Sequence, residues 1–548
     1  MKKNSGLILS CLILAALIII IYFPIAKTFY QQDEWLGYGL YLANGPKMIL
    51  QNSGGILGVI FGQGRILTNL LYFLFYKYSP LNVFPIAIFA ITFHVINTLI
   101  VFFLAKKLFK NTFPAFLGSL FFAVSSVSQS AITWPAASLN TLPSTTLILG
   151  ALVFYFKYIE TFKNKWIFYS FIFIYISLFF KEKGVFLFLL FPLFSLIYTK
   201  QNIRTFIKRY WYCLAATFLI VIFRIWGFKS EPEQVALFLT GSSKYFYDSL
   251  IVRSILYPLT SLSLSIIPSV PFLNFAKYIT NVYYPFFPSQ QFNLIAQTVV
   301  LDLLVTIFSF VIILISAGLL KLTKLKTRKV VIFWFVLLAA SFLPYIIISK
   351  SYAYLESRYY YLASATWGVI FAWMVNLVVE KIRFKYVRTA FLIIFVLFIY
   401  LHTKTVAGDI GKLVSESERR VNILNQILAI KPKLNDERNI FYVTGDTDYY
   451  ILGNKVPFQQ GFGYTLLTWY GAKSKYPPVF FNNADLYEIG REEYFETNGF
   501  GFGYFTNLED LRAGITGNKF PKTAVTALYY NSKENKIIDI SAEVAKSL

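Results

Sequence analysis

The stretch "LILSCLILAALIIIIYF", residues 7–23, decides the fold class of this chain. It contains no charged residue and is about long enough to cross a hydrocarbon core roughly 30 Å thick. A similar run, "VRTAFLIIFVLFIYL", covers residues 387–401. Apolar residues make up 57% of the 548 residues and charged residues only 14%. The sequence therefore predicts a polytopic α-helical membrane protein.

Apolar runs of this kind predict about eleven membrane spans. They lie near 6–26, 82–105, 113–128, 141–158, 166–180, 184–199, 210–227, 296–320, 330–348, 362–380 and 387–403.

Every second loop between these spans is rich in Lys and Arg. Examples are "KKLFK" (106–110), "KYIETFKNK" (157–165) and "KLTKLKTRK" (321–329), whereas the alternate loop "SSVSQSAITWPAASLN" (125–140) has neither residue. Basic loops stay in the cytoplasm. The pattern predicts a multi-pass plasma-membrane protein with a cytoplasmic N-terminus and, after an odd number of spans, an extracytoplasmic C-terminal region.

The net charge of +24 does not indicate nucleic-acid binding. Residues 401–548 hold equal numbers of basic and acidic residues, so the whole excess lies in the apolar part of the chain, where basic loops set orientation.

Cys11 and Cys213 fall within apolar runs and predict neither a disulfide nor a metal-thiolate site. The first apolar run lacks a clear cleavage site before Asp33, so we interpret it as a span.

Two domains are predicted. Residues 1–404 form the membrane domain, with an extracytoplasmic first loop (27–80) and a long loop (228–295). Residues 405–548 form a small extracytoplasmic α/β domain. In it, "NIFYVTG" (439–445) and "DYYILGN" (448–454) predict strands, "NLEDLRAGI" (507–515) predicts a helix, and residues 523–541 predict a hairpin.

An acidic pair stands where the first span leaves the membrane. Asp33 and Glu34 occur in "YQQDEWLGYG" (30–39), yet the first 400 residues contain only ten acids. Interfacial polarity is one interpretation. A carboxylate among aromatic residues could instead accept a proton from a hydroxyl or hold a divalent cation.

Two further segments place charges beside apolar runs. "FFKEKGVF" (179–186) joins two short spans, so Lys181, Glu182 and Lys183 lie near or within the apolar layer, where ionisable groups are costly and are functional candidates. A plain polar turn is the alternative. "LESRYYYLAS" (355–364) puts Glu356, Arg358 and Tyr359 at the mouth of a span. An Arg there can pair with phosphate oxygens or serve as an anchor at the interface.

Four other residues are weaker candidates for substrate binding. Arg65 in "GQGRIL", like Arg358, could pair with phosphate oxygens or serve as an anchor at the interface. His94 and Asn97 in "FHVIN" lie one helical turn apart on one face, which favours helix packing over chemistry. Trp134 precedes Pro135 and favours a structural turn over a platform for sugar stacking.

Taken together, these motifs resemble those of the GT-C superfamily of membrane glycosyltransferases, most closely its protein O-mannosyltransferase-like branch. That branch includes transmembrane proteins whose spans precede tetratricopeptide repeats. The matching features, in chain order, are the acidic pair Asp33-Glu34, Arg65, the His-x-x-Asn of His94 and Asn97, the pair Lys181-Glu182, and the Glu-Ser-Arg-Tyr of 356–359. They cover about residues 1–400. The C-terminal region shows no tetratricopeptide period, and the loop around Trp134 lacks the acidic and His residues of the repeat-bearing relatives.

The resemblance implies an inverting transfer of a sugar from a polyprenyl-phosphate donor to a protein or glycolipid hydroxyl on the outer face. Asp33 would act as base with Glu34 as its support, and Arg358, Lys181 and Arg65 would hold the donor phosphate. No cofactor is required, although the pattern admits a divalent cation. The alternatives are a transporter or flippase for lipid-linked glycans, and a non-catalytic membrane scaffold.

Overall fold

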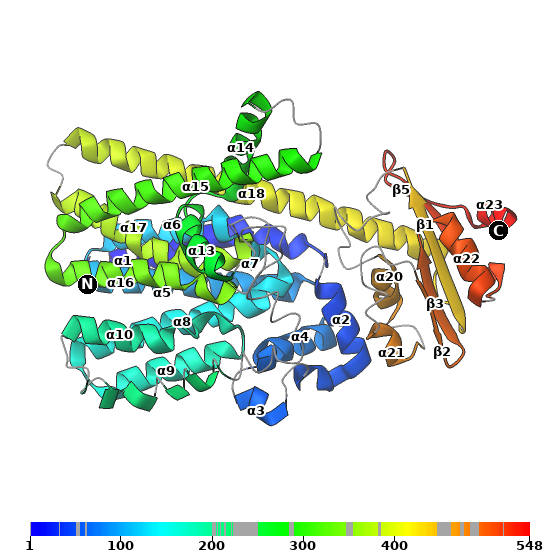
Figure 1. Ribbon diagram of the computed structural model, residues 1–548, viewed down its shortest axis with the longest axis horizontal. Coiled ribbons are helices and arrows are strands. Elements are labelled where there is room, and N and C mark those ends of the chain that lie inside the picture. Colours follow the sequence, from blue (N-terminus) through cyan, green and yellow to red (C-terminus); the bar gives the residue numbers. More distant parts are fainter. Residues whose placement is uncertain are drawn as a thin grey trace. The chain divides into compact units, whose positions relative to one another are not determined.

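The computed structural model forms two compact units (Figure 1). The first, which we call the helical unit, comprises Met1–Phe23, Asn52–Thr68 and Phe89–Gly408; the second, the sheet unit, comprises Pro24–Gln51, Asn69–Ile88 and Asp409–Leu548. The structure describes residues 2–31, 33–50, 55–60, 63–199, 204, 207–208, 210–212, 215–216, 218–220, 222, 250–283, 290–346, 355–381, 385–446, 462–471, 476–482, 493–518 and 520–548.

The helical unit is a bundle of apolar helices. Its described helices include α1 (Lys2–Tyr22), α3 (Gly55–Ile60), α5 (Phe84–Phe109), α6 (Thr112–Ala123), α7 (Ser130–Thr133), α8 (Pro135–Thr161), α9 (Asn164–Leu178), α10 (Leu187–Thr199), α13 (Leu250–Leu264), α14 (Ser269–Tyr283), α15 (Gln290–Lys321), α16 (Leu325–Ala340), α17 (Tyr361–Lys381) and the first part of α18 (Lys385–Ile430).

Seven helices in the described part of the chain are long and apolar enough to cross a membrane, or eight if the bent pair α13 and α14 counts as one span. The seven match the predicted spans near 6–26, 82–105, 141–158, 296–320, 330–348, 362–380 and 387–403. The chain is an integral membrane protein. Spans predicted at 113–128, 166–180 and 184–199 correspond to the shorter helices α6, α9 and α10, and most of 210–227 lies outside the described residues.

The predicted long loop at 228–295 contains two helices. Residues 250–264 and 269–283 form α13 and α14, which meet at a bend of 100°. The assignment of 228–295 as a loop stays a prediction. The buried face of α13 carries hydroxyl residues such as Thr260, Ser261 and Ser263, whose side chains bond to helix carbonyls or to neighbouring hydroxyl groups. These residues lower the hydropathy of a helix that is nevertheless packed inside the unit.

Close packing of α6 against α17 sits at the centre of the helical unit. α17 is buried along most of its length. A side chain at Gly118 of α6 would overlap the carbonyl oxygen of Gly368 and lie 2.8 Å from Cβ of Ala372, both on α17. The absence of a side chain at Gly118 therefore allows the two helix backbones to approach closely.

The sheet unit contains a five-stranded sheet in the order β2-β3-β1-β4-β5. Its strands are β1 (Arg438–Gly445), β2 (Glu493–Thr497), β3 (Phe500–Phe505), β4 (Val525–Asn531) and β5 (Lys536–Asp539). β1 pairs in parallel with β3 and β4, while β2–β3 and β4–β5 are antiparallel. The predicted strand at 439–445, the hairpin at 523–541 and the helix at 507–515, which is α22 (Leu508–Asn518), are confirmed; the strand predicted at 448–454 lies outside the described residues.

Both faces of this sheet are covered, as the alternation along β1 shows. Ile440 and Tyr442 join a core with α22 and α23 (Ser541–Ser547), whereas Phe441 and Val443 join a larger aromatic core on the other face. That larger core includes residues from α2 (Asp33–Asn44), α4 (Ile66–Tyr78), the end of α18, α20 (Phe462–Gly471) and α21 (Pro478–Phe481). Segments of the predicted first loop thus share a core with the C-terminal region.

The predicted domain boundary at residue 404 falls within a helix. α18 runs without a break from Lys385 to Ile430, and the division between the units falls at Gly408. The polar helical segment predicted after 405 is therefore the continuation of the last span. The boundary itself stays a prediction.

Replacing Gly118 by Ala should destabilise the helical unit. The added methyl group would force α6 away from α17, and overpacking of this kind costs about 1–3 kcal/mol. The midpoint of thermal unfolding in detergent should fall. Gly318→Ala in α15 is the control, because its methyl group would meet nothing within 4 Å and should leave the midpoint unchanged or slightly raised. Equal midpoints for the two variants would contradict this packing role.

Candidate functional site

The turn between α9 and α10 is fixed by hydrogen bonds from two other segments. The carbonyl of Phe179 accepts the N–H of Leu67 at 3.1 Å, and that of Phe180 accepts the Thr68 hydroxyl at 2.9 Å. The carbonyl of Lys181 accepts the Ser144 hydroxyl at 3.3 Å. This backbone is therefore rigidly placed before its charged side chains are considered.

Lys181 and Lys183 are buried by the fold of this turn. Lys181 is 5% exposed and donates to Asn140 Oδ1 at 3.2 Å and Thr141 Oγ1 at 3.1 Å, both on α8. Lys183 is 1% exposed, and its Nζ has no hydrogen-bond partner among the described residues. Gly184 makes this approach feasible, because a Cβ there would lie 2.8 Å from the Ser177 hydroxyl.

Burial disfavours the charged form of both lysines. Desolvation, and then the nearby Arg65 guanidinium, lower the pKa of Lys181 from 10.5 to about 7. This corresponds to roughly 5 kcal/mol against the charged form. Desolvation and then Lys181 hold the pKa of Lys183 well below its usual range. An anion placed beside them would favour protonation of both.

Arg65 and Glu182 form a two-pronged ion pair. Arg65 lies in the short turn Gln63–Arg65 before α4, and its Nη2 and Nε donate to the two Glu182 oxygens at 2.8 and 3.2 Å. The Arg65 side chain is 46% exposed, so the pair adds little to stability. Its effect is to hold a guanidinium next to the two buried lysines.

Arg358 stacks on Trp134. Its guanidinium carbon lies 4.2 Å from the centre of the Trp134 ring, and its Nη2 is 2.9 Å from Glu356 Oε2 and 3.2 Å from the Tyr359 hydroxyl. Trp134 precedes the first residue of α8, Pro135, which suits a helix start. Trp134 separates α7 from α8, and its ring lies against a cation; its role in substrate binding stays a prediction.

These residues form one group, which we call the cation cluster: Arg65, Trp134, Lys181, Glu182, Lys183, Tyr345, Glu356, Arg358 and Tyr359. Lys181 lies 5.4 Å from the Tyr359 ring, Lys183 lies 5.9 Å from the Tyr345 ring, and the two rings are 4.5 Å apart. Four basic and two acidic side chains leave a formal charge of +2.

Several donors in the cation cluster have no partner. Lys183 Nζ, Tyr345 Oη and Trp134 Nε1 are buried without a hydrogen bond within the described residues. Unsatisfied buried donors are costly and call for an explanation. Donors and positive charge of this kind suit an anionic group such as a phosphate.

His94 and Asn97 lie in a separate buried network. His94 Nδ1 is 2.8 Å from the Tyr361 hydroxyl, and its Nε2 is 3.0 Å from the carbonyl of Ala123. Asn97 donates to the carbonyl of Leu142 and accepts from Thr146. These bonds tie α5 to α8 and α17, as expected for helix packing; a role in substrate binding stays a prediction.

The acidic pair belongs to the sheet unit and begins α2. Glu34 is 1% exposed; its Oε2 accepts the N–H of Gln31 at 3.1 Å, and its carbonyl accepts the Tyr76 hydroxyl at 3.2 Å. Asp33 is half-buried beside it. Both acids lie in the first turn, where the helix dipole stabilises negative charge. Glu34 is thus built into the start of α2, and Asp33 is the acid with more exposure to solvent.

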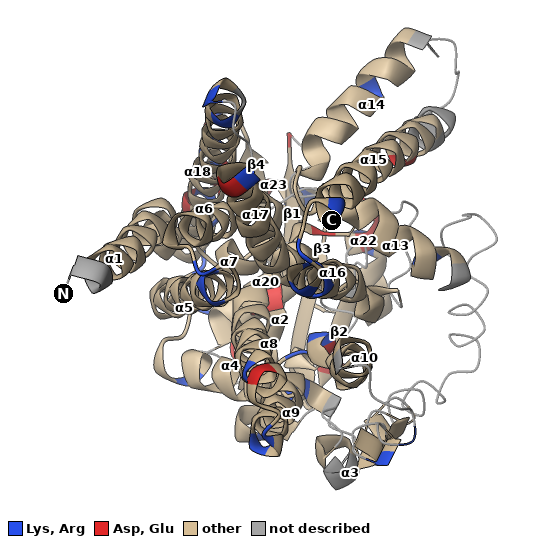
Figure 2. Ribbon diagram, turned by 90° about the vertical axis from the view of Figure 1, so that its left-hand side faces the viewer, with Lys and Arg blue, Asp and Glu red and all other residues tan. Residues whose placement is uncertain are grey.

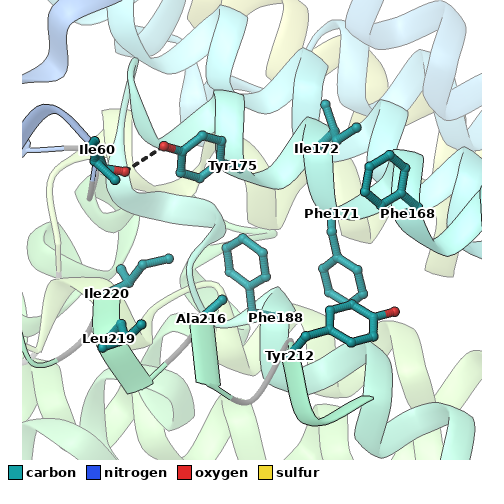
Figure 3. Close-up of a pocket in the computed structure, with 10 residues that line it drawn as sticks. All are labelled: Ile60, Phe168, Phe171, Ile172, Tyr175, Phe188, Tyr212, Ala216, Leu219 and Ile220. Atoms are coloured by element: carbon teal, nitrogen blue, oxygen red, sulfur yellow. Dashed lines mark hydrogen bonds between the residues drawn. The ribbon is translucent and has the colours of Figure 1, made fainter. Parts of the chain in front are cut away.

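An apolar pocket of about 330 Å³ lies beside α9 (Figure 3). Its lining includes Phe168, Phe171, Phe188 and Leu219 and is almost wholly apolar. The hydroxyl of Tyr175 at its edge donates to the carbonyl of Ile60 at 2.6 Å, five residues before Arg65. The pocket therefore adjoins segments that also contribute to the cation cluster.

No set of metal ligands is evident in the described part of the chain: no three His, Cys, Asp or Glu side chains gather as they would around an ion. The role of a divalent cation is not decided by this observation.

The sequence indicated every member of the cation cluster except Tyr345, although it assigned no role in substrate binding to Lys183. It also gave no role to Asn140 and Thr141, which accept hydrogen bonds from Lys181. Asn140 and Thr141 lie nearly two turns beyond Trp134 in an apolar helix, so a polar pair near the start of a span was the available signal. Nothing in the sequence around Tyr345 distinguishes it from the many other interfacial tyrosines.

Comparisons with known proteins find likenesses among solved structures. No family model matches the sequence, and no curated protein matches it. The structure is similar to that of ArnT from Cupriavidus metallidurans bound to undecaprenyl phosphate, with a TM-score of 0.44 and 10% identity, over 96% of this chain and 93% of that one. Because both values are low, neither family membership nor activity follows from this likeness.

Replacing Lys183 by Met should stabilise the protein and impair phosphate binding. The change removes a buried, unpartnered amine while keeping a side chain of similar length, so the thermal midpoint should rise. If the cluster binds an organic phosphate, the affinity for it should fall about tenfold or more. The exposed Lys163→Met variant should change neither quantity. A Lys183→Met variant of lower stability with normal affinity would mean that the amine is structural.

Phosphate binding should weaken as pH rises, because Lys181 loses its proton through about pH 7. Between pH 6 and 8.5 the affinity for a phosphodiester, whose own charge is constant over this range, should fall about tenfold. Lys181→Arg stays charged and should flatten this dependence, provided that affinity at pH 6 is retained. A wild-type affinity independent of pH would show that Lys181 does not contact the anion as an ammonium group.

Proposed function

We propose that this chain is an integral membrane glycosyltransferase of the GT-C type. It transfers a sugar from a polyprenyl-phosphate donor to an acceptor hydroxyl, with inversion, on the extracytoplasmic face of the plasma membrane. The observation that carries the proposal is the cation cluster, in which four basic side chains from three separate segments surround buried donors that lack partners. The family motifs noted in the sequence supply most of these residues.

The donor phosphate is bound by the cation cluster. Arg358, held over Trp134, and the lysines at 181 and 183 face the phosphate, while Arg65 is kept in place by Glu182. As the bond between the anomeric carbon and the phosphate oxygen breaks, negative charge grows on the phosphate. Basic groups that are already in position stabilise that charge without reorganising.

The acceptor is activated by the acidic pair. Asp33 takes the proton of the acceptor hydroxyl as its oxygen attacks the anomeric carbon from the side opposite the phosphate. Glu34 positions the start of α2 through its bonds to Gln31 and Tyr76. The products are the glycosylated acceptor and polyprenyl phosphate, and the proton remains on Asp33 until solvent removes it.

The isoprenoid tail is accommodated by the apolar pocket beside α9. Its lining is almost wholly apolar and suits a hydrocarbon, and Ile60 at its edge precedes Arg65 by five residues in the sequence. A lipid-linked donor therefore finds an apolar pocket and a phosphate site on adjoining segments of the helical unit.

Replacing Asp33 by Asn should reduce transfer at least about 100-fold, the usual contribution of a general base. The measurement is transfer of a labelled sugar from a polyprenyl-phosphate donor in proteoliposomes. Asp510→Asn is the matched control, because it makes the same change in the first turn of α22 and should have no effect. Expression and membrane insertion must be equal. Activity of Asp33→Asn within twofold of wild type would exclude the base role.

The same proteoliposomes separate the other candidate functions. A flippase would move labelled polyprenyl lipid between leaflets without transferring sugar, and its activity would survive the Asp33→Asn change. A scaffold would show neither activity in any variant. The acceptor, a protein or glycolipid hydroxyl of the cell envelope, is identified by the glycan lost when the gene is deleted.

A further inference from the structure

A second basic site lies at the far ends of the helices that carry the cation cluster. A pocket of about 780 Å³ is formed where α5, α8 and α10 end and α16 begins. Along α8, Asn140 borders the cation cluster and Glu160 lines this pocket, a separation of about 30 Å at 1.5 Å per residue. This is close to the thickness of a hydrocarbon core. The two sites are therefore separated along α8 by about the thickness of a membrane core.

The lining of this pocket is strongly basic. Lys107, Lys110, Lys326 and Lys329 contribute to it, against a single acid, Glu160, which pairs with Lys107 at 2.9 Å. Figure 2 shows blue Lys and Arg segments around the labels of α5, α9 and α16. These are the loops that the sequence predicts to be cytoplasmic.

Helix geometry adds to the positive potential. Leu325, Lys326 and Thr327 line the pocket and form the first turn of α16, which no side chain caps and which contains no acid. Lys329 is fixed by bonds to the carbonyls of Ile197 and Tyr198 at the end of α10. Lysines at the C-terminal ends of α5 and α10 also interact favourably with the dipoles of those helices. This interaction does not explain why the pocket is so large, or why the N-terminus of α16 beside it has no capping side chain.

Apolar side chains lie next to the lysines. Leu325 is 68% exposed and Phe162 is 45% exposed, and both line the pocket, as does Phe156. A free phosphate ion would gain nothing from these side chains, whereas a phospholipid places its phosphate beside its own hydrocarbon. Basic pockets between the ends of membrane helices are suited to anionic lipid head groups.

We propose that this pocket binds the head group of an anionic phospholipid from the leaflet opposite the candidate catalytic site. Lys110, Lys326 and the start of α16 contact the phosphodiester, and Leu325 and Phe162 contact the glycerol backbone and the first carbons of the chains. The site is independent of the proposed glycosyl transfer.

The test uses the full chain, purified in detergent and freed of lipid, with thermal midpoints as the readout. Short-chain dioctanoyl phosphatidylglycerol should raise the midpoint by several degrees, and zwitterionic dioctanoyl phosphatidylcholine should not. Glycerol phosphate and inorganic phosphate at equal concentration should have little effect. Equal shifts with both lipids, or a full shift with either soluble phosphate, would overturn the proposal.

Variants locate the site. Lys110→Gln with Lys326→Gln should weaken the apparent affinity for phosphatidylglycerol about tenfold or more. Lys163→Gln with Lys324→Gln is the matched control: it removes the same charge at neighbouring helix ends outside the pocket lining and should retain the wild-type response. The response should also survive Lys326→Arg with Lys110 intact. Equal loss in the test and control pairs would show a general charge effect and would refute the pocket.

Discussion

The cost of burying charge among apolar helices governs the arrangement of the helical unit. Lys181 is tolerated because Asn140 and Thr141 accept its hydrogen bonds. Lys183 has no such partner among the described residues. An amine that is buried without a hydrogen-bond partner destabilises the fold, while the neighbouring charges are satisfied. Local destabilisation of this kind is typical of binding sites.

The sheet unit holds the acidic pair on a rigid support. α2, which begins with the acidic pair, is packed through Trp35 and Tyr38 into an aromatic core shared with α20 and α21. Glu34 is fixed by a neighbouring backbone N–H and by a tyrosine hydroxyl. Long aromatic side chains with few rotatable bonds hold such a helix in place at low entropic cost, so a catalytic carboxylate at its start would be preorganised.

Much of this structure follows from sequence patterns that depend on one segment alone. Continuous hydropathy predicted the long spans, and alternation and turn residues predicted β1 and the β4–β5 hairpin. Features that depend on contacts with a distant segment of the chain could not be predicted from the sequence. The hydroxyl-rich α13 is a helix because its polar groups are satisfied inside the bundle. Asn140 and Thr141 border the cation cluster, and Tyr345 belongs to it, only because another segment brings Lys181 and Lys183 beside them.

The composition of the large aromatic core has a consequence for biogenesis. Its first contributors lie before residue 89 and its last ones after residue 408, so the N-terminal part of this core emerges about 320 residues before its partners exist. At synthesis rates of roughly 5–20 residues per second, the aromatic side chains of α2 wait on the order of tens of seconds. During that time they must be shielded by lipid or by a chaperone on the side of the membrane to which they have been delivered.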